Sequence, residues 1–256
     1  MNIRIKRILA ACLIITSCVS FCGCKSSSSV DFVSDVNTVS LQTLTDGSSD
    51  SDSGADVKVE NPIDFKDLQS KNSDLYAWIY IPNTSVDYPI AQSGKGEDDA
   101  FYLHHGVDKS YYFAGTIYSE KKNSKDFNDR NTLLYGHNML DGSMFTTLHK
   151  FEDESFFENN QYIYIYTPGH ILTYKICAAY EYDDRHILNS FDFSDDKVWA
   201  DYVKWVNKPE SPYTCNYRDT GLTTDDTIIT LSTCTNYRSS DRYLVQAKLE
   251  SDKPTL

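Results

Sequence analysis

Residues Thr227–Cys234 read TIITLSTC, a run of β-branched and apolar side chains that ends in small hydroxyl residues and a cysteine. A run of this kind, followed by a polar turn, is typical of a buried strand. Such a strand would deliver Cys234 to the edge of a sheet, where a thiol can meet a substrate.

A second strand is predicted after the polar turn. Residues Arg242–Leu249 (RYLVQAKL) alternate polar and apolar side chains, as a strand with one buried face does. If the two strands pair as a hairpin, Arg242 at the head of one lies beside Cys234 at the tail of the other. A guanidinium in this position favours a thiolate and can hold a developing oxyanion. Arg238, in the turn, is a second candidate for that role.

A catalytic thiol also needs a base, and the sequence offers six histidines. They are His104, His105, His137, His149, His170 and His186. His137 follows the predicted strand 132–135 through Gly136, so it is presented at a strand end as Cys234 is. A lone histidine there would be read as an ordinary polar residue, and the other five are read in that way. The strand-end cysteine and arginine favour His137 as the base.

The N-terminus resembles an export signal. Three basic residues precede residues 8–23, which are almost entirely apolar or small. This run is short for a membrane-spanning helix and suits the apolar region of a signal peptide. Its end, Gly23-Cys24, resembles a bacterial lipoprotein processing site with Cys24 as lipid anchor; an uncleaved signal anchor is the alternative. Both predict a chain tethered by residues 1–24 to the extracellular face of the cell membrane.

The rest of the chain divides into a tether and one domain. Residues 25–60 are rich in Ser, Asp, Thr and Gly without a sustained hydrophobic period, which predicts a flexible tether. Residues 61–256 are predicted to form the catalytic domain. The formal net charge of the chain is −13. Such a surface is unsuited to nucleic acid or to an anionic bilayer, so no nucleic-acid partner is expected.

Three cysteines lie beyond the predicted signal: Cys177, Cys215 and Cys234. An odd number in an exported chain leaves at least one thiol free unless it pairs between chains. No two of them have the CxxC spacing of a structural zinc site. Cys177 lies in an apolar strand pattern and is interpreted as a core residue, although a disulfide between Cys177 and Cys215 stays open.

The predicted fold is mostly β. Strands are expected at 78–81, 85–90, 113–119, 132–135, 161–167, 171–182, 227–234 and 242–249. A first helix is expected to begin with Asn61 as its cap. A longer helix is expected over 194–207, capped by Ser194 and inserted between late strands, with one apolar stripe that packs on the core.

Three motifs together resemble the signature of sortases, the cysteine transpeptidases of Gram-positive cell surfaces. They are NTLLYGHNM at 131–139, TLSTC at 230–234 and the arginine that heads the last strand. Arg242 fits that position better than Arg238, because it begins the RYLV strand as the arginine of the family does. The resemblance extends from residue 61 to residue 249.

Several features resemble class B in particular: the helical segment before Trp78, the strand Asp87–Ile90 and the long helix between late strands. The resemblance implies a closed sortase-type β-barrel with N-terminal helices and that inserted helix. It implies Cys234 as nucleophile, His137 as acid and base, and Arg242 as the residue that steadies substrate and oxyanion.

The resemblance also implies the partners. A surface protein would be cleaved after the Thr of a C-terminal sorting motif, which family analogy suggests contains Asn-Pro or Ser-Pro. The protein would then be transferred from a thioester on Cys234 to an amine of a peptidoglycan precursor or cross-bridge. No cofactor and no metal are required. Tyr135 and Ser232, which flank the two catalytic residues, are candidates to line the peptide groove, with packing as an equal alternative.

Other functions fit parts of the sequence. A pilin-polymerising sortase would share every catalytic residue. A non-catalytic, membrane-tethered binding module would account for the acidic tether and the abundant tyrosines. A papain-like or caspase-like protease is disfavoured, because the local signatures of those families are absent around Cys234.

Overall fold

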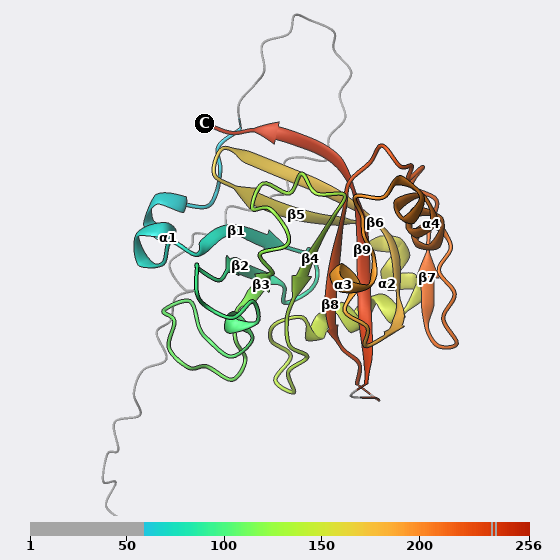
Figure 1. Ribbon diagram of the computed structural model, residues 1–256, viewed down its shortest axis with the longest axis horizontal. Helices are drawn as coiled ribbons and strands as arrows, with labels where there is room; N and C mark the ends of the chain where they lie inside the picture. Colours follow the sequence, from blue (N-terminus) through green and yellow to red (C-terminus); the bar gives the residue numbers. More distant parts are fainter. Residues whose placement is uncertain (1–58, 237, 239) are drawn as a thin grey trace, which may run out of the picture. The chain divides into compact units, whose positions relative to one another are not determined.

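The described part of the chain forms a closed β-barrel, as predicted (Figure 1). The computed structural model describes residues 59–236, 238 and 240–256; the predicted signal and nearly all of the predicted tether lie outside these residues. The strands follow one another in the order β5-β1-β2-β3-β4-β8-β9-β6, and pairing of β5 with β6 closes the ring. β7 pairs with β6 outside the ring.

The strands are β1 (Leu75–Tyr80), β2 (Asp87–Gln92), β3 (Ile117–Ser119), β4 (Asn131–Tyr135), β5 (Tyr162–Thr167), β6 (His170–Asp183), β7 (Cys215–Tyr217), β8 (Ile228–Cys234) and β9 (Asp241–Pro254). The α-helices are α1 (Phe65–Lys71), α2 (Glu154–Asn159), α3 (Ile187–Ser190) and α4 (Asp196–Asn207), and the 3₁₀ helices are η1 (Phe101–Leu103) and η2 (Thr146–Glu152).

Alternation along the strands separates two hydrophobic cores. Ile229 and Leu231 of β8 point into the barrel with the main core, whereas Ile228 belongs to a second core outside the barrel wall. Successive strand residues face opposite sides of a sheet. Ser232 and Cys234 therefore lie on the outer face with Ile228, and this choice of face places the thiol outside the packed interior.

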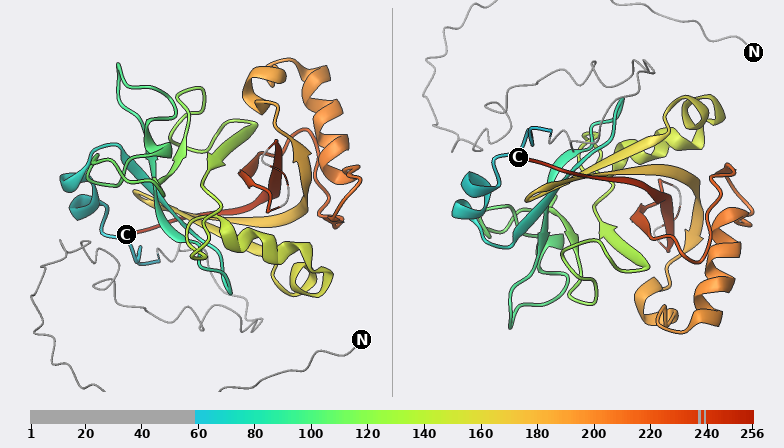
Figure 2. Two further views of the ribbon diagram at one scale, coloured as in Figure 1. Left: turned by 90° about the horizontal axis from the view of Figure 1, so that it is seen from below. Right: turned by 90° about the horizontal axis from the view of Figure 1, so that it is seen from above.

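The second core is built by α4, the inserted helix, which packs along the outside of β6 (Figure 2). Its buried stripe, as predicted, consists of Trp199, Tyr202, Val203 and Val206. The helix begins one residue later than expected. Asp195, not Ser194, is its N-cap, and the Asp195 carboxylate accepts hydrogen bonds from the backbone N–H groups of Lys197 and Val198.

The first helix also begins later than its sequence predicts. Asp64 is the N-cap of α1, and its carboxylate accepts a hydrogen bond from the N–H of Asp67 at 2.9 Å. Asn61 instead donates its side-chain amide to the carbonyl of Thr167 at 2.9 Å, which attaches the incoming chain to the barrel. Val59, inside the predicted tether, forms a parallel bridge with Thr255.

The segment predicted as a strand at 113–119 is strand only from Ile117 onward. Gly115 has a φ of +65°, a left-handed conformation that ends extended structure. Phe113 before it is 59% exposed. The first half of this segment is a loop, and the loop contributes to the site described below.

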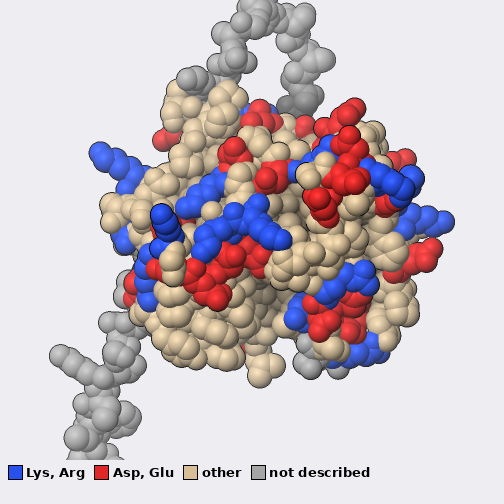
Figure 3. Space-filling model, in the orientation of Figure 1, with Lys and Arg blue, Asp and Glu red and all other residues tan. Residues whose placement is uncertain are grey.

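Charged groups of both signs are interleaved on the face shown in Figure 3. The ion pairs of the described residues include Lys109–Asp74 at 2.6 Å and Arg185–Asp183 at 2.5 Å. Within the described ranges, no helix is long and apolar enough to cross a membrane.

Candidate active site

The two strands that carry the predicted base and nucleophile are neighbours in the barrel. β4 and β8 run parallel, and Tyr135 pairs with Ser232. The N–H of Gly136 extends this ladder to the carbonyl of Ser232 at 3.2 Å. His137 and Cys234 each stand two residues beyond the Tyr135–Ser232 pair. The parallel register therefore brings them to the same end of the sheet.

The cysteine and the arginine face each other across the β8–β9 hairpin, as predicted. Cys234 pairs with Arg242 in the antiparallel register. The next residue, Thr235, donates its N–H to the carbonyl of Asp241 at 3.3 Å. Cys234 and Arg242 are thus a pair without hydrogen bonds to each other, the type in which opposite side chains approach most closely.

One pocket with a volume of about 330 Å³ collects all five residues predicted for the site. It is lined by Tyr135, His137, Ser232, Cys234 and Arg242, among others. Arg238 does not line it. Its guanidinium lies over the ring of Tyr213, 3.8 Å from the centroid, and forms an ion pair with Asp241 at 3.3 Å. The structure thereby favours Arg242 over Arg238 as the cation beside the thiol.

The imidazole of His137 is oriented by a backbone carbonyl. Its Nε2 lies 2.9 Å from the carbonyl oxygen of Leu103, so Nε2–H is the donor. The ring stacks on Phe113, with centroids 5.7 Å apart and planes 11° apart, and lies 5.3 Å from the ring of His104. These contacts leave Nδ1 as the nitrogen that can accept a proton.

The environment of His137 lowers its pKa from the usual value. The main cause is partial burial, which disfavours the charged imidazolium. The carbonyl of Leu103 opposes this effect, and the nearby His104 adds to it. The neutral form that can act as a base is thereby favoured near neutral pH.

Gly136 permits this arrangement. A Cβ at this position would lie 2.8 Å from the ring of Phe145, closer than such atoms approach in proteins. The backbone between β4 and His137 therefore packs directly against the core, and a larger residue would require the side chains of Ile117 and Phe145 to shift.

A model of the sortase domain matches residues 79–250 of the chain. The chain belongs to the sortase family. Sortase B of Listeria monocytogenes is 37% identical over 190 residues, covering 73% of this chain and 74% of the relative. Sortase B of Staphylococcus aureus is 29% identical over 187 residues, covering 72% and 74%. The structure of Clostridium perfringens sortase B superimposes with a TM-score of 0.65 at 31% identity, covering 73% of this chain and all of that one.

The chain is therefore a class B sortase and a cysteine transpeptidase, as the sequence motifs predict. The β-barrel fold of this sortase is confirmed in the same way. Its catalytic residues remain assigned from the motifs and from the geometry of the pocket.

Sequence reasoning missed several contributors to the site of this sortase. The carbonyl of Leu103 has no side-chain signature, and the sequence pattern predicts Phe113 in a strand, whereas the strand begins at Ile117. The sequence predicts an ordinary polar residue at His186, yet His186 lines the pocket and its Nε2 lies 2.7 Å from Oε1 of Glu120. The sequence predicts the same of His149, although the Nε2 of this histidine lies 3.0 Å from the carbonyl oxygen of Cys234.

The other two described cysteines of this sortase are free thiols, so the disulfide left open by the sequence does not form. Cys177 is buried, and its thiol contacts the carbonyl of Gln246 at 3.2 Å. Burial raises the pKa of Cys177 to about 12, which keeps that thiol protonated. Cys215 is half-buried, and burial raises its pKa as well. Neither thiol lines the pocket of Cys234.

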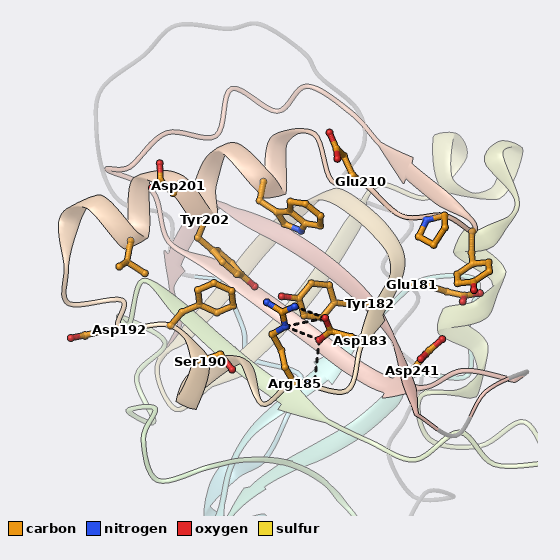
Figure 4. A pocket seen from close by; sticks show the side chains of 15 residues that line it. Glu181, Tyr182, Asp183, Arg185, Ser190, Asp192, Asp201, Tyr202, Glu210 and Asp241 are labelled. Atoms are coloured by element: carbon orange, nitrogen blue, oxygen red, sulfur yellow. Dashed lines mark hydrogen bonds and ion pairs between the residues drawn. The ribbon is translucent and has the colours of Figure 1, made fainter.

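A larger hollow of about 730 Å³ lies beside the pocket, under α4 (Figure 4). Tyr182, Asp183 and Arg185 line both cavities. The guanidinium of Arg185 donates hydrogen bonds to the carboxylate of Asp183, as the dashed lines in Figure 4 show. Because the larger hollow contains neither the thiol nor His137, the smaller pocket is the candidate active site of this sortase.

Proposed function

We propose that this sortase cleaves a C-terminal sorting motif after threonine and transfers the protein to an amine of peptidoglycan. The observation that supports the proposal is the convergence of Cys234, His137 and Arg242 on one pocket at the ends of three adjacent strands. A nucleophile, a proton carrier and a fixed cation are the groups that acyl transfer needs.

The first half-reaction forms a thioester. The thiol of Cys234 gives its proton to the neutral His137, the resulting thiolate Sγ attacks the threonine carbonyl carbon, and the carbonyl π electrons move onto oxygen. The C–N bond then breaks as the oxyanion collapses, and the imidazolium of His137 gives its proton to the leaving amine. The products are an acyl–Cys234 thioester, a neutral His137 and the released C-terminal peptide.

The second half-reaction uses the neutral histidine as a base. His137 accepts a proton from the incoming amine as the amine nitrogen attacks the thioester carbonyl. The C–S bond breaks, the thiolate of Cys234 is restored, and His137 is again an imidazolium. A balanced cycle therefore needs no cofactor and no metal.

Arg242 supports both half-reactions through its charge. It lies directly across the hairpin from Cys234 and lines the same pocket. Charged hydrogen bonds from a guanidinium would hold the tetrahedral oxyanion or the backbone of the sorting peptide. Tyr135 and Ser232 face the same cavity and would contact the peptide beside the scissile bond.

The hydrogen bonds of the described residues do not join the imidazole of His137 to the thiol of Cys234. Nε2 is occupied by Leu103, and the free nitrogen is Nδ1. Catalytic contacts in unliganded enzymes often form only when substrate binds. We expect the peptide to fill the space between the two groups.

Mass spectrometry of the full chain with threonine-containing sorting peptides and an amine acceptor tests the proposal. A thioester adduct on Cys234 that resolves to an amine-linked product is expected. Cys234→Ala and His137→Ala should abolish turnover, whereas Cys215→Ala, which removes another partly exposed thiol, should not. Absence of any adduct on the wild type would favour a non-catalytic binding module.

Two further proposals concern partners and location. The acceptor amine belongs to a peptidoglycan precursor or cross-bridge; products linked to a pilin lysine in the same assay would instead identify a pilin polymerase.

The second proposal is that the N-terminal segment holds the enzyme on the extracellular face of the membrane, through lipidated Cys24 or as a signal anchor. Metabolic labelling with a fatty acid analogue, compared between wild type and Cys24→Ala, distinguishes the two forms of attachment.

A further inference from the structure

The backbone carbonyl of Cys234 is held by two side chains that the proposed mechanism does not use. Asn138 Nδ2 donates to this oxygen at 3.1 Å, and His149 Nε2 lies 3.0 Å from it. Both residues come from the segment that follows β4. The backbone at Cys234 is therefore held by these two side chains as well as by the pairing of its own strand, β8.

The geometry of the strand end explains why this carbonyl needs outside donors. The carbonyl of Ser232 points toward β4 and accepts the N–H of Gly136 at 3.2 Å. Cys234, two residues on, points its carbonyl the same way, because strand residues repeat every second position. β4 has ended by then. The side-chain amide of Asn138 stands where the next backbone donor of the ladder would be.

His149 is itself held in place. Its side chain is 9% exposed, and its Nδ1 lies 2.5 Å from the Oε1 of Glu152. Its ring lies 4.8 Å from the ring of Tyr243 on β9. A carbonyl only accepts hydrogen bonds, so Nε2–H of His149 is the donor to Cys234, and the contact of Nδ1 with Glu152 fixes the orientation of the ring.

The same segment also holds His137. The carbonyl of His137 accepts the N–H of Phe145 at 3.0 Å, and Thr146 Oγ1 donates to the carbonyl of Met139 at 2.9 Å. Thr146 begins η2, the helix that carries His149. Residues 138–149 thus hold the backbone both at His137 and at Cys234.

We infer that His149, with Asn138, is a positioning residue for the nucleophile. By fixing the peptide plane after Cys234, the two donors fix the direction in which Sγ leaves the strand, and hence its line of attack. The inference rests on the proposed function for its effect on turnover. The contact itself can be tested independently of turnover.

The kinetic test compares His149→Leu and His149→Gln with the wild-type full chain. His149→Leu is expected to lower kcat for thioester formation by about tenfold or more while KM changes little, because the nucleophile is misaligned and the groove is intact. His149→Gln, whose amide can donate to the same carbonyl, should recover most of the rate. His170→Leu is the matched control. It removes a histidine that contacts Asp252 at 2.7 Å and begins β6, whereas the pocket is lined by Tyr182 and Asp183 at the end of that strand.

A spectroscopic test reports the contact directly. Cys234-Thr235 is the only Cys-Thr step in the chain, so ¹³C-carbonyl cysteine with ¹⁵N-threonine gives one HNCO signal. Loss of a donor to the carbonyl should move its ¹³C resonance upfield in His149→Leu and leave it unchanged in His170→Leu. If His149→Leu fails to fold, Asn138→Ala, which removes the other donor to this carbonyl, should give the same upfield shift, and an unchanged resonance would overturn the inference.

The outcomes separate the two hypotheses. No turnover by the wild type would contradict the proposed function, and the HNCO shift would still decide whether His149 holds the carbonyl. An unchanged carbonyl resonance in His149→Leu, or a kcat equal to that of His170→Leu, would overturn the positioning role. A fall in kcat together with the upfield shift and recovery by glutamine would establish it.

Discussion

A side chain at Gly115 would overlap the carbonyl oxygen of Leu103, the atom that orients His137. The left-handed conformation of Gly115 and the orientation of the His137 imidazole thus depend on the same peptide group. The N–H of Thr116 strengthens this arrangement by donating to the carbonyl of Tyr102 at 2.9 Å. The loop before β3 is therefore part of the site, although none of its backbone reacts.

Substitution of Gly115 should therefore affect stability and activity together. Gly115→Ala is expected to cost more than the roughly 1–2 kcal/mol of a left-handed alanine, because the methyl group also displaces Leu103. Gly169→Ala is the control, since Gly169 has a φ of +91° but nothing within 4 Å of its Cβ position. Thermal unfolding and kcat of both variants check this, and equal losses in the two would contradict it.

The pKa of His137 should be measurably below 6.5, its ordinary value. Removing the neighbouring ring in His104→Gln is expected to raise this pKa, because one repulsive charge is lost. The adjacent His105, whose ring stacks on Phe101, is the control, and His105→Gln should leave the pKa unchanged. NMR titration of the His137 ring proton gives both values.

The same pKa predicts a pH dependence of stability. The folded-state pKa of His137 lies below the unfolded value, so the unfolded chain binds more protons in the interval between them. This contribution to stability is complete above the unfolded value of about 6.5 and is lost as pH falls through the folded pKa. Unfolding free energies of wild type and His137→Gln should therefore differ in slope below neutral pH. Parallel slopes would argue against the lowered pKa.

The two arginines around the thiol should differ in their effect on catalysis. Arg242→Ala is expected to lower kcat/KM by about 10²–10³-fold, as loss of an oxyanion donor does. Arg238→Ala should change it little, because that guanidinium is engaged with Asp241 and Tyr213. Steady-state kinetics of both variants decides between them. A larger loss for Arg238→Ala would reverse the assignment.

The cap of α4 gives a prediction about stability alone. Asp195→Ala should cost about 1 kcal/mol of unfolding free energy, because two backbone N–H groups lose their acceptor. Ser194→Ala should cost less than about 0.5 kcal/mol, since its hydroxyl only contacts the exposed Asp192. Denaturant unfolding of the two variants would show whether the cap is placed correctly.

Much of the site was predictable because its strands are strongly patterned. The runs around Leu134 and Ile229 are β-branched and apolar, and each ends in a reactive side chain. The hairpin of β8 and β9 is local, so the meeting of Cys234 and Arg242 followed from the sequence pattern. The apolar stripe of α4 predicts the helix, although its N-cap is Asp195 and not the preceding Ser194.

The rest depends on contacts that leave no mark in the sequence. Leu103 contributes only its carbonyl, from 34 residues before His137. The positive φ of Gly115 ends the strand pattern that includes Phe113, and a single sequence does not reveal this conformation. His149 lies next to the charged Lys150 in the sequence, and only the folded chain brings its imidazole to the carbonyl of Cys234, 85 residues away.

The parallel pairing of β4 with β8 also has a consequence for how the enzyme matures. Asn138 and the carbonyl that it holds are 96 residues apart, whereas the β5–β6 and β8–β9 hairpins close over short loops. Contacts between distant residues form late, because loop-closure entropy opposes them until the surrounding structure is in place. The folding chain should therefore acquire most of its secondary structure before its thiol becomes reactive toward peptides. Such an enzyme would remain catalytically silent until its barrel has closed.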